Sequence, residues 1–352
     1  MLKVLGLGEE EQWLSTVKEF ENHDVYYLPQ YTKAFRLHGD GEPLLFFYES
    51  PDTRAVNVVM KRDIAAALPF SGVLSDKTYF DLSTPYGYGG FLIEGDRSEA
   101  AVKKLDEAYC EYCRQNGIVS EFVRFHPLLK NYGCLTPMYE IVEMGKTIFL
   151  DLSSPGVIDG NIRPQTHNRI RKAQRDCVGV SSGNSPEIFT LFSEMYNETM
   201  SRNQAKPYYF FSHEFFDSIR RDMPDNAVIF YALCCGHVAA MELVIYGNHK
   251  MHSHLQASKK DYQHLSPVPL LLYTEALWGC ENGIREFHLG GGLGSADDNI
   301  YQFKSNFNRN ADTRFHAGRK IFDRDKYDRL LQLRNQTLAA AERPGFFPEY
   351  RA

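Results

Sequence analysis

Apolar residues in the first half of the chain recur with the periods of strands and of one long helix. Two apolar runs flank the turn Ser50–Thr53, as in a hairpin. Further along, Ala101, Leu105 and Ala108 recur at helical spacing. The pattern predicts these elements in order: strands Pro43–Glu49, Ala55–Lys61 and Gly89–Ile93, a helix Ser98–Gln115 ended by Gly117, and a strand Ile118–Phe125.

The second half of the chain repeats that order. The predicted elements are the strands Ala227–Cys234, His237–Tyr246 and Lys250–Ser258, a helix Val268–Cys280 followed by Gly283, and a strand Ile284–Leu289. The two helix-to-strand joints, CRQNGIVSEF and CENGIREF, also share letters. A duplicated unit explains the repetition, and independent convergence of helix–glycine–strand joints is the alternative.

Strands that alternate with helices in this way predict a mixed α/β fold, and the length of 352 residues favours two domains. Four more elements are expected outside the repeats: a strand Lys146–Leu152, a basic helix within Asn161–Cys177, a helix Glu187–Arg202 and a charged amphipathic helix Lys326–Ala341. We expect a first domain over residues 1–145, a second over 146–318, and a C-terminal segment, 319–352, that packs back on the first.

Composition narrows the classes of function. With 43% hydrophobic residues the chain can bury a sizeable core, and a net charge of −6 shows no overall basic excess for nucleic acid or anionic membrane. No apolar run reaches the roughly 18 residues of a membrane span. The N-terminus lacks a secretory pattern and the seven cysteines fit reduced thiols, so we expect a cytoplasmic protein.

The stretch FHLGGGLG, residues 287–294, joins a strand to glycines. Such a joint can turn backbone N–H groups toward an anion, but its spacing matches neither the dinucleotide nor the Walker phosphate motif. Glycines at Gly291 and Gly292 would let a ligand approach the backbone closely. A plain turn is the alternative.

A lysine follows this loop at a distinctive position. Phe303 and Phe307 lie at helical spacing and would face the core, and Lys304 lies beside them. A lysine held by aromatic packing suits binding of a phosphate or of a developing negative charge. The alternative is a surface lysine whose stem covers apolar neighbours.

Several other stretches are candidates for binding. The densest cationic segment of the chain contains Arg169 and Arg171 and suits phosphate contact, although a solvated helix face explains it equally well. Aromatic side chains could stack on a sugar or base, or could belong to the core. These further candidates are Arg202, Tyr208, Tyr209, Tyr86 and Tyr88.

Two alternating histidines on one strand raise the question of a metal. His252 and His254 point to one face, but a fitting third ligand is not evident, so we expect no metal site and keep His254 as a substrate-binding candidate.

The order of these motifs resembles the Fem-type (FemA/FemB/FemX-like) branch of the GNAT acyltransferase superfamily. The matching pieces are HNRIRKAQ, NETMSRNQ, CENGIREFHLGGG and DDNIYQFKSNF, between about Thr147 and Phe315, with weaker support from YGYGG and FVRFHPL in the first half. The resemblance implies two GNAT-like domains, each with a mixed, mostly antiparallel sheet flanked by helices.

The resemblance also implies an activity. Fem-type enzymes move an aminoacyl group from aminoacyl-tRNA to an amine of a peptidoglycan precursor. Lys304 and Phe303 would hold the donor end, and Arg202 would contact the precursor phosphate. Where the family often has an acid before a proline in the first domain, this chain has His126, which could act as a base.

Two rival hypotheses stay open at this point. One is a GNAT N-acyltransferase that uses an acyl-CoA on an envelope amino sugar. The other is a non-catalytic protein that binds a nucleotide-linked precursor or RNA. We expect no tightly bound cofactor under any of the three hypotheses. In the leading hypothesis the partners are aminoacyl-tRNA and a nucleotide- or lipid-linked muropeptide precursor. We expect the protein in the cytoplasm or at the inner face of the membrane.

Overall fold

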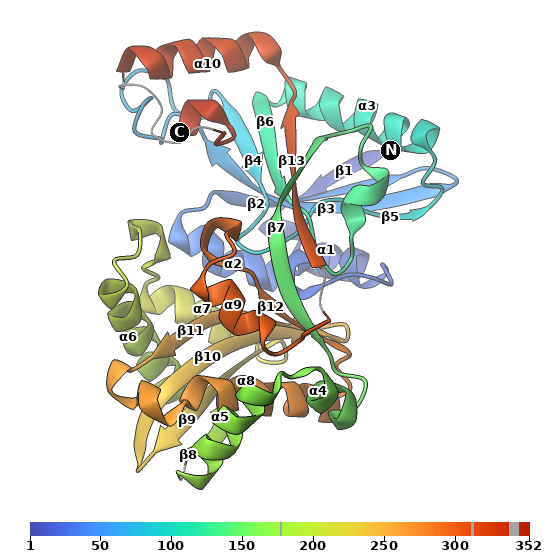
Figure 1. Ribbon diagram of the computed structural model, residues 1–352. Helices are drawn as coiled ribbons and strands as arrows, with labels where there is room; N and C mark the ends of the chain where they lie inside the picture. The colour runs from blue at the N-terminus through green and yellow to red at the C-terminus, as the bar shows by residue number, and fades with distance from the viewer. Residues whose placement is uncertain (177, 311–312, 338–344) are drawn as a thin grey trace. The chain divides into compact units, whose positions relative to one another are not determined.

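The structure is a computed structural model that describes residues 1–176, 178–310, 313–337 and 345–352. The chain divides into two compact units (Figure 1). Unit 1 comprises residues 1–144 and 315–352, and unit 2 comprises residues 145–314. Within the described residues, no helix combines the length and the apolar character that crossing a bilayer requires.

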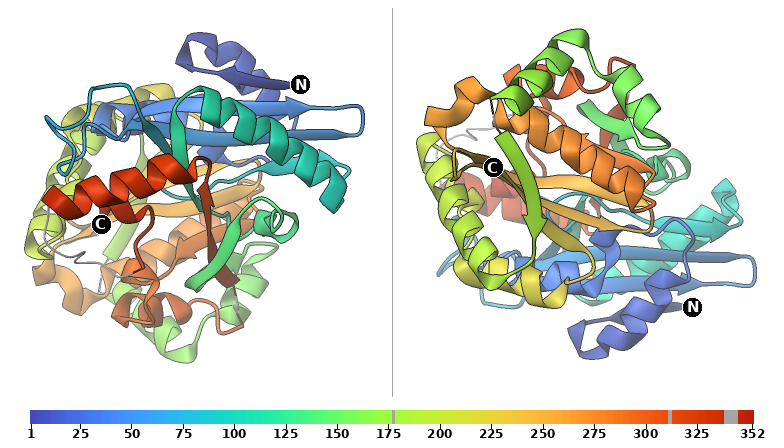
Figure 2. Two further views of the ribbon diagram at one scale, coloured as in Figure 1. Left: turned by 90° about the horizontal axis from the view of Figure 1, so that it is seen from above. Right: turned by 90° about the horizontal axis from the view of Figure 1, so that it is seen from below.

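Unit 1 is a mixed sheet flanked by helices. Its strands lie in the order β1, β2, β3, β4, β6, β13, with β5 paired to β3. The elements are β1 (Leu2–Leu5), α1 (Glu10–Lys18), α2 (Pro29–His38), β2 (Glu42–Glu49), β3 (Thr53–Asp63), β4 (Phe80–Ser83), β5 (Leu92–Gly95), α3 (Glu99–Gln115), β6 (Ile118–Arg124), β13 (Thr313–Ile321) and α10 (Arg324–Thr337). Figure 2 shows the long β2–β3 hairpin.

The core of unit 1 forms where α3 covers the sheet. Val102, Leu105 and Tyr109 of α3 pack with Phe46 and other apolar residues of the strands. Ser98 caps this helix by accepting a hydrogen bond from the Ala101 amide, as serine prefers to do at an N-terminus. A second apolar cluster lies under α10 and joins that helix to the sheet of unit 1.

Unit 2 is built in the same way. Its strands lie in the order β8, β9, β10, β11, β12, β7. The elements are β7 (Glu140–Asp151), α4 (Pro155–Asn161), α5 (Pro164–Arg175), β8 (Val178–Gly183), α6 (Pro186–Arg202), α7 (His213–Asp222), β9 (Ala227–Cys234), β10 (His237–Gly247), β11 (Lys250–Ser258), α8 (Pro267–Glu281), β12 (Glu286–Gly290) and α9 (Asn299–Ser305). Residues from α4, α5 and α8 share one core cluster with the strands, while α6 packs with α7 and against β11.

The two units share one strand order. In each, a meander of antiparallel strands ends beside a parallel pair whose members are joined through a long helix: β4 pairs with β6, and β11 pairs with β12. The last strand of each sheet comes from outside that run, as β13 pairs with β6 and β7 with β12. The expected mixed α/β fold with mostly antiparallel sheets is confirmed.

Most predicted elements are present with shifted ends, and some were missed. Among the described residues, four strands were not predicted from the pattern: β1, β4 and β8, which are short or weakly apolar, and β13. The strand expected at Gly89–Ile93 begins later, at Leu92, and Gly89 instead bridges to Phe125. The predicted end of the last helix, at Ala341, lies outside the described residues.

Candidate active site in unit 2

The site begins where the parallel strands β11 and β12 part. They pair over three residues, ending with His252 opposite His288. Beyond that point β12 continues against β7, with Gly290 opposite Ile148, and β11 continues against β10 to Ser258. The carboxyl ends of two neighbouring parallel strands therefore diverge, which is where α/β proteins commonly bind ligands.

A glycine-rich loop leaves β12 at this opening. Gly290 has a φ of +77°, which favours glycine, and the chain turns there toward α9. The Asp298 carboxylate closes the loop, because it accepts hydrogen bonds from the amides of Leu293, Ile300 and Tyr301. These hydrogen bonds, first that of Tyr301, lower the pKa of Asp298. The acid thus fixes both the loop and the first turn of α9.

Lys304 lies on α9 and reaches back to that loop. Its Nζ donates a hydrogen bond to the Gly291 carbonyl at 3.1 Å. A Cβ at Gly290 would lie 3.4 Å from the same nitrogen, so glycine leaves the amine its space. Phe303 packs on the core of unit 2 and on Phe307, with ring centroids 5.5 Å apart. The lysine therefore has a fixed place at the opening rather than a free surface position.

The charge of Lys304 depends on its surroundings. Burial lowers the pKa of the amine, while the carboxyl groups of Glu242 and Asp298 raise it. Glu242 lies on β10, opposite Gln256 of β11, whose amide donates to it at 2.6 Å. An ammonium group in this position can stabilise a negative charge that develops on a carbonyl oxygen.

The basic helix α5 starts beside the end of α9. The Arg163 amide donates to the Asn306 carbonyl at 2.9 Å, and the Gln165 side chain donates to Asn306 Oδ1 at 2.9 Å. Arg169 and Arg171 are exposed, and the segment 163–175 contains no acidic residue. A cationic face therefore leads away from the neighbourhood of Lys304, as a long polyanionic substrate would require.

The candidates on α6 and the following turn form a separate group. Arg202 ends α6 and is exposed, one turn beyond Thr199, which exchanges hydrogen bonds with the Ser258 backbone at the end of β11. Tyr208, 41% exposed, and Tyr209 follow in a short 3₁₀ turn with ring centroids 5.5 Å apart. The group offers exposed rings and one cation.

His254 occupies a bulge in β11. Leu243 pairs with Leu255 and Val244 with Ser253, so His254 is the extra residue. Burial, and then the neighbouring His252, lower the pKa of His254 to about 3. The imidazole is therefore neutral near pH 7 and can bind by hydrogen bonds but not by charge. Within either unit taken alone, no three His, Cys, Asp or Glu side chains of the described residues gather closely enough for a metal ion.

The tyrosine candidates of unit 1 are engaged in packing. The Tyr88 ring lies 5.5 Å from the Phe315 ring and under the Arg124 guanidinium, 5.6 Å away. The Tyr86 ring stacks on Phe35 at 5.7 Å, and its carbonyl accepts a hydrogen bond from Tyr31. These contacts explain their place in the fold, and a binding role for them stays a prediction.

His126 lies buried at the end of β6. Its Nδ1 accepts a hydrogen bond from the Leu129 amide at 3.3 Å, and its Nε2 lies 3.2 Å from a carboxylate oxygen of Asp24. With Nδ1 as acceptor, Nε2 carries the proton and faces the acid. Both ring nitrogens thus meet protein groups within unit 1, which favours a structural role. A role as general base stays a prediction.

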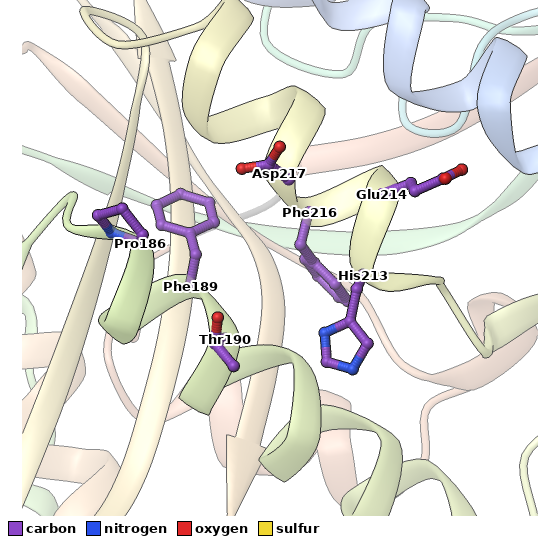
Figure 3. A pocket seen from close by; sticks show the side chains of 7 residues that line it. All are labelled: Pro186, Phe189, Thr190, His213, Glu214, Phe216 and Asp217. Atoms are coloured by element: carbon purple, nitrogen blue, oxygen red, sulfur yellow. The ribbon is translucent and has the colours of Figure 1, made fainter.

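Unit 2 also has a hollow between α6 and α7, with a volume of about 360 Å³ (Figure 3). Phe189 and Phe216 form its apolar wall, and His213 and Thr190 flank it from the two helices. Asp217 at its edge pairs with Arg220 at 2.8 Å, so its charge is compensated. None of the sequence-predicted residues lines this hollow.

Three residues of the site escaped the sequence analysis. Glu242 and Gln256 support Lys304 from the strands, and Asp298 caps its helix. A signal existed for each acid: Glu242 is a lone charge in the apolar run AAMELVIY, and Asp298 precedes a helical pattern as an N-cap would. Their partners were not visible, because they come from other elements.

Residues 161–305 match the family model described as an acetyltransferase (GNAT) domain. None of the curated proteins compared with the chain matches it in sequence. The match covers most of unit 2, including β11, β12, the glycine loop and Lys304.

Solved structures extend the likeness over the whole chain. The crystal structure of FemX is similar with a TM-score of 0.65 at 12% identity, covering 93% of this chain and 99% of that one. The C-terminal domain of a candidate lysylphosphatidylglycerol synthetase from Agrobacterium fabrum has a TM-score of 0.55 at 13% identity, covering 88% and 92%. A tandem GNAT protein from the clavulanic acid biosynthesis pathway has a TM-score of 0.50 at 11% identity, covering 92% and 99%.

These identities are too low to carry more than the fold, and the family model adds the class of chemistry. The expected likeness to Fem-type proteins is confirmed at the level of fold. Residues 161–305 match the acetyltransferase (GNAT) family model, and the chain as a whole is similar in fold to FemX and to the tandem GNAT protein.

Proposed function

We propose that the protein transfers an aminoacyl group from aminoacyl-tRNA to an amine of a peptidoglycan precursor. The observation that carries this proposal is the Lys304 ammonium, held by the Gly291 carbonyl at the opening between β11 and β12. A partly buried cation held in place at such an opening suits acyl transfer, in which negative charge develops on one carbonyl oxygen.

The chemistry needs few protein groups. The acceptor amine attacks the ester carbonyl, an amide bond forms, and the ester C–O bond breaks as the ribose hydroxyl takes a proton. Lys304 would stabilise the oxyanion. Phe303 would hold α9 against the core, so that the Lys304 ammonium group stays in place. The attacking amine must be neutral, and the residue that takes its proton is not assigned by this arrangement.

Charge and aromatic groups support the choice of substrates. The face of α5 with Arg169 and Arg171 suits the phosphates of the tRNA acceptor end, since α5 begins beside α9. Arg202 with Tyr208 and Tyr209 suits the phosphate and rings of a nucleotide-linked precursor. A role of His254 in unit 2, and of Tyr86 and Tyr88 in unit 1, in binding substrate stays a prediction.

The GNAT match favours one rival, a transferase that uses acyl-CoA on an envelope amino sugar. The start of α8 argues against it. A pyrophosphate bound at a helix N-terminus uses the first backbone N–H groups, but Pro267 and Pro269 occupy the first and third positions of α8 and have no N–H. The loop between β11 and α8 also contains no glycine.

A transfer assay with separate donors tests the proposal. Purified protein is incubated with a mixture of aminoacyl-tRNAs and a nucleotide-linked muropeptide, and the muropeptide mass is followed. We expect a gain equal to one aminoacyl residue. Transfer from acyl-CoA to an amino sugar, with none from tRNA, would instead establish the rival, and aminoacyl transfer only to phosphatidylglycerol vesicles would move the acceptor to a lipid. Micromolar binding of the precursor without turnover on any donor would leave a non-catalytic binder.

A further inference from the structure

Two carboxyl groups are fully buried on neighbouring elements of unit 2. Glu242 lies on β10 and Glu275 on α8, the helix that packs against β10, and both are 0% exposed. Burial, and then the charge of Glu242, raise the pKa of Glu275 well above its ordinary value, and burial also raises the pKa of Glu242. Two ionised carboxylates in such surroundings do not coexist at neutral pH.

The hydrogen-bond donors around the two acids are unevenly divided. The Gln256 amide donates to Glu242 Oε2 at 2.6 Å, and Ser253 and Lys304 also favour the ionised form of Glu242. By contrast, neither carboxylate oxygen of Glu275 has a hydrogen-bond partner among the described residues, whereas Glu242 lacks a partner only at Oε1. An ionised carboxylate needs donors, so the charge belongs where the donors are.

We propose that Glu242 and Glu275 act as one unit with a single proton held on Glu275, and that the charge left on Glu242 keeps Lys304 in its charged form. Glu242 is thus a positioning residue for the lysine, and Glu275 is its neutral partner. The consequence for transfer rests on the proposed function, but the charge assignment does not.

The balance of charges at Lys304 gives this assignment its effect. Burial lowers the pKa of Lys304, and two acids oppose it: Glu242 from β10 and Asp298 at the start of α9. Asp298 is already bound by three backbone amides of its own loop. Loss of the Glu242 charge would therefore allow Lys304 to become neutral at a lower pH, and a neutral amine stabilises an oxyanion poorly.

Amine labelling measures this without any substrate. The full chain is treated with limiting acetic anhydride at a series of pH values, and mass spectrometry of the peptide that carries Lys304 reports its neutral fraction. In Glu242→Gln the pKa of Lys304 should fall, so that its labelling at pH 7.5 rises about tenfold. In Glu275→Gln the labelling of Lys304 should stay within twofold of wild type, because position 275 is uncharged in the wild type and in the variant.

The asymmetry between the two variants decides the proposal. Equal effects of Glu242→Gln and Glu275→Gln, or no effect of Glu242→Gln, would overturn it. Glu121→Gln is the matched control, since Glu121 is also fully buried but belongs to unit 1. It should leave the labelling of Lys304 unchanged, so that a change there would reveal a general loss of structure.

A second measurement covers the case in which Glu242→Gln does not fold, because it needs only the wild-type chain and Glu275→Gln. With ¹³C at the glutamate carboxyl carbons, one signal should keep the chemical shift of a protonated acid above pH 7 and should disappear in Glu275→Gln. A signal that titrates near pH 4 to 5 and disappears in the same variant would contradict the assignment. Neither measurement uses transfer, so failure of the proposed function and failure of this inference are distinguishable.

Discussion

The two parallel strand pairs of the molecule end in opposite ways. In unit 1, the chain after β4 stays beside β6: the Thr84 amide donates to the Phe122 carbonyl, the Gly89 amide to the Arg124 carbonyl, and Asn131 to the Gly89 carbonyl. In unit 2, β11 and β12 part after His252, and a glycine loop with Lys304 stands at the opening. One strand order thus gives a closed joint and an open one.

The buried glutamates of the two units also differ in how many hydrogen-bond donors surround them. Glu121 of unit 1 accepts hydrogen bonds from Asn57 at 3.0 Å and from Tyr139 at 2.8 Å, so both of its oxygens have donors. In unit 2, Glu275 has none among the described residues, and Glu242 supports the lysine. A buried acid whose oxygens all accept hydrogen bonds stabilises the fold. In a buried pair with unequal hydrogen bonding, one acid can stay charged while the other keeps a proton. We therefore assign structure to the joint of unit 1 and chemistry to that of unit 2.

The largest effect expected from this comparison is on Lys304. Lys304→Ala should lower the rate of aminoacyl transfer about 100- to 1,000-fold, the usual loss on removing one group that stabilises an oxyanion. The control is Lys146→Ala. Lys146 Nζ lies 3.3 Å from a carboxylate oxygen of Asp297, in the loop between β12 and α9. The rate of transfer in Lys146→Ala should stay within threefold. Unchanged transfer in Lys304→Ala would take the lysine out of the mechanism.

The next effect concerns the closed joint and pH. Burial raises the pKa of Glu121 to about 7, above the ordinary value of 4.5. The folded state therefore holds the proton more tightly than the unfolded chain, so its contribution is complete below pH 4.5 and is lost as pH rises to about 7. The free energy of unfolding should fall by on the order of 3 kcal/mol across that window.

Urea unfolding at pH 5 and pH 7.5 checks this fall, with Glu121→Gln as the comparison. The variant lacks a titrating group at that position, so its stability should change less between the two pH values. If the free energy of unfolding changes equally between pH 5 and pH 7.5 in the wild type and the variant, Glu121 does not titrate in this range.

Glycine substitutions compare the two joints directly. Gly90 of unit 1 has a φ of +87°, and a Cβ there would lie 2.7 Å from the Phe125 ring. Gly90→Ala should therefore destabilise unit 1 by about 2 kcal/mol, seen as faster hydrogen exchange in β6. Gly290→Ala, with a φ of +77°, should cost about 1 kcal/mol but lower transfer on the order of tenfold, because the methyl group crowds Lys304. Equal effects of the two variants on transfer would count against separate roles.

The smallest effect is expected on the basic helix. Arg169→Ala or Arg171→Ala should weaken tRNA binding several-fold and lower the slope of log affinity against log salt by about one for each phosphate that the variant no longer binds. Filter binding at several salt concentrations measures that slope. Arg36→Ala of unit 1, exposed and paired with Glu42 at 2.8 Å, is the matched control and should leave the slope unchanged. A slope that does not move in either α5 variant would remove this face from the tRNA site.

The fold was predictable where local patterns are strong. The helices α3 and α8 and the strands after them follow from apolar period and terminal glycines, which are properties of neighbouring residues. The short strands β1, β4 and β8 were missed because four to six residues give too little period to detect. They are strands because the neighbouring strand supplies their hydrogen bonds.

Some features of the candidate site were visible in the sequence, and others depend on contacts between distant residues. The place of Lys304 beside aromatic residues was visible in the spacing of Phe303 and Phe307, but its contact with Gly291 was not, since the two lie 13 positions apart. The partnership of Glu242, Gln256 and Glu275 was also invisible, because one strand pairing and one helix packing bring the three residues together.

By itself, the sequence determined the order of many elements, their repetition in two halves, and the presence of a glycine-rich stretch followed by a lysine beside aromatic residues. Only the tertiary structure decided which joint is open. Both joints carry glycines, and the difference lies in whether long-range hydrogen bonds, such as those of Asn131 to Gly89 and Phe91, close the gap. Such bonds join residues about 40 positions apart, and periodicity along the chain does not encode them.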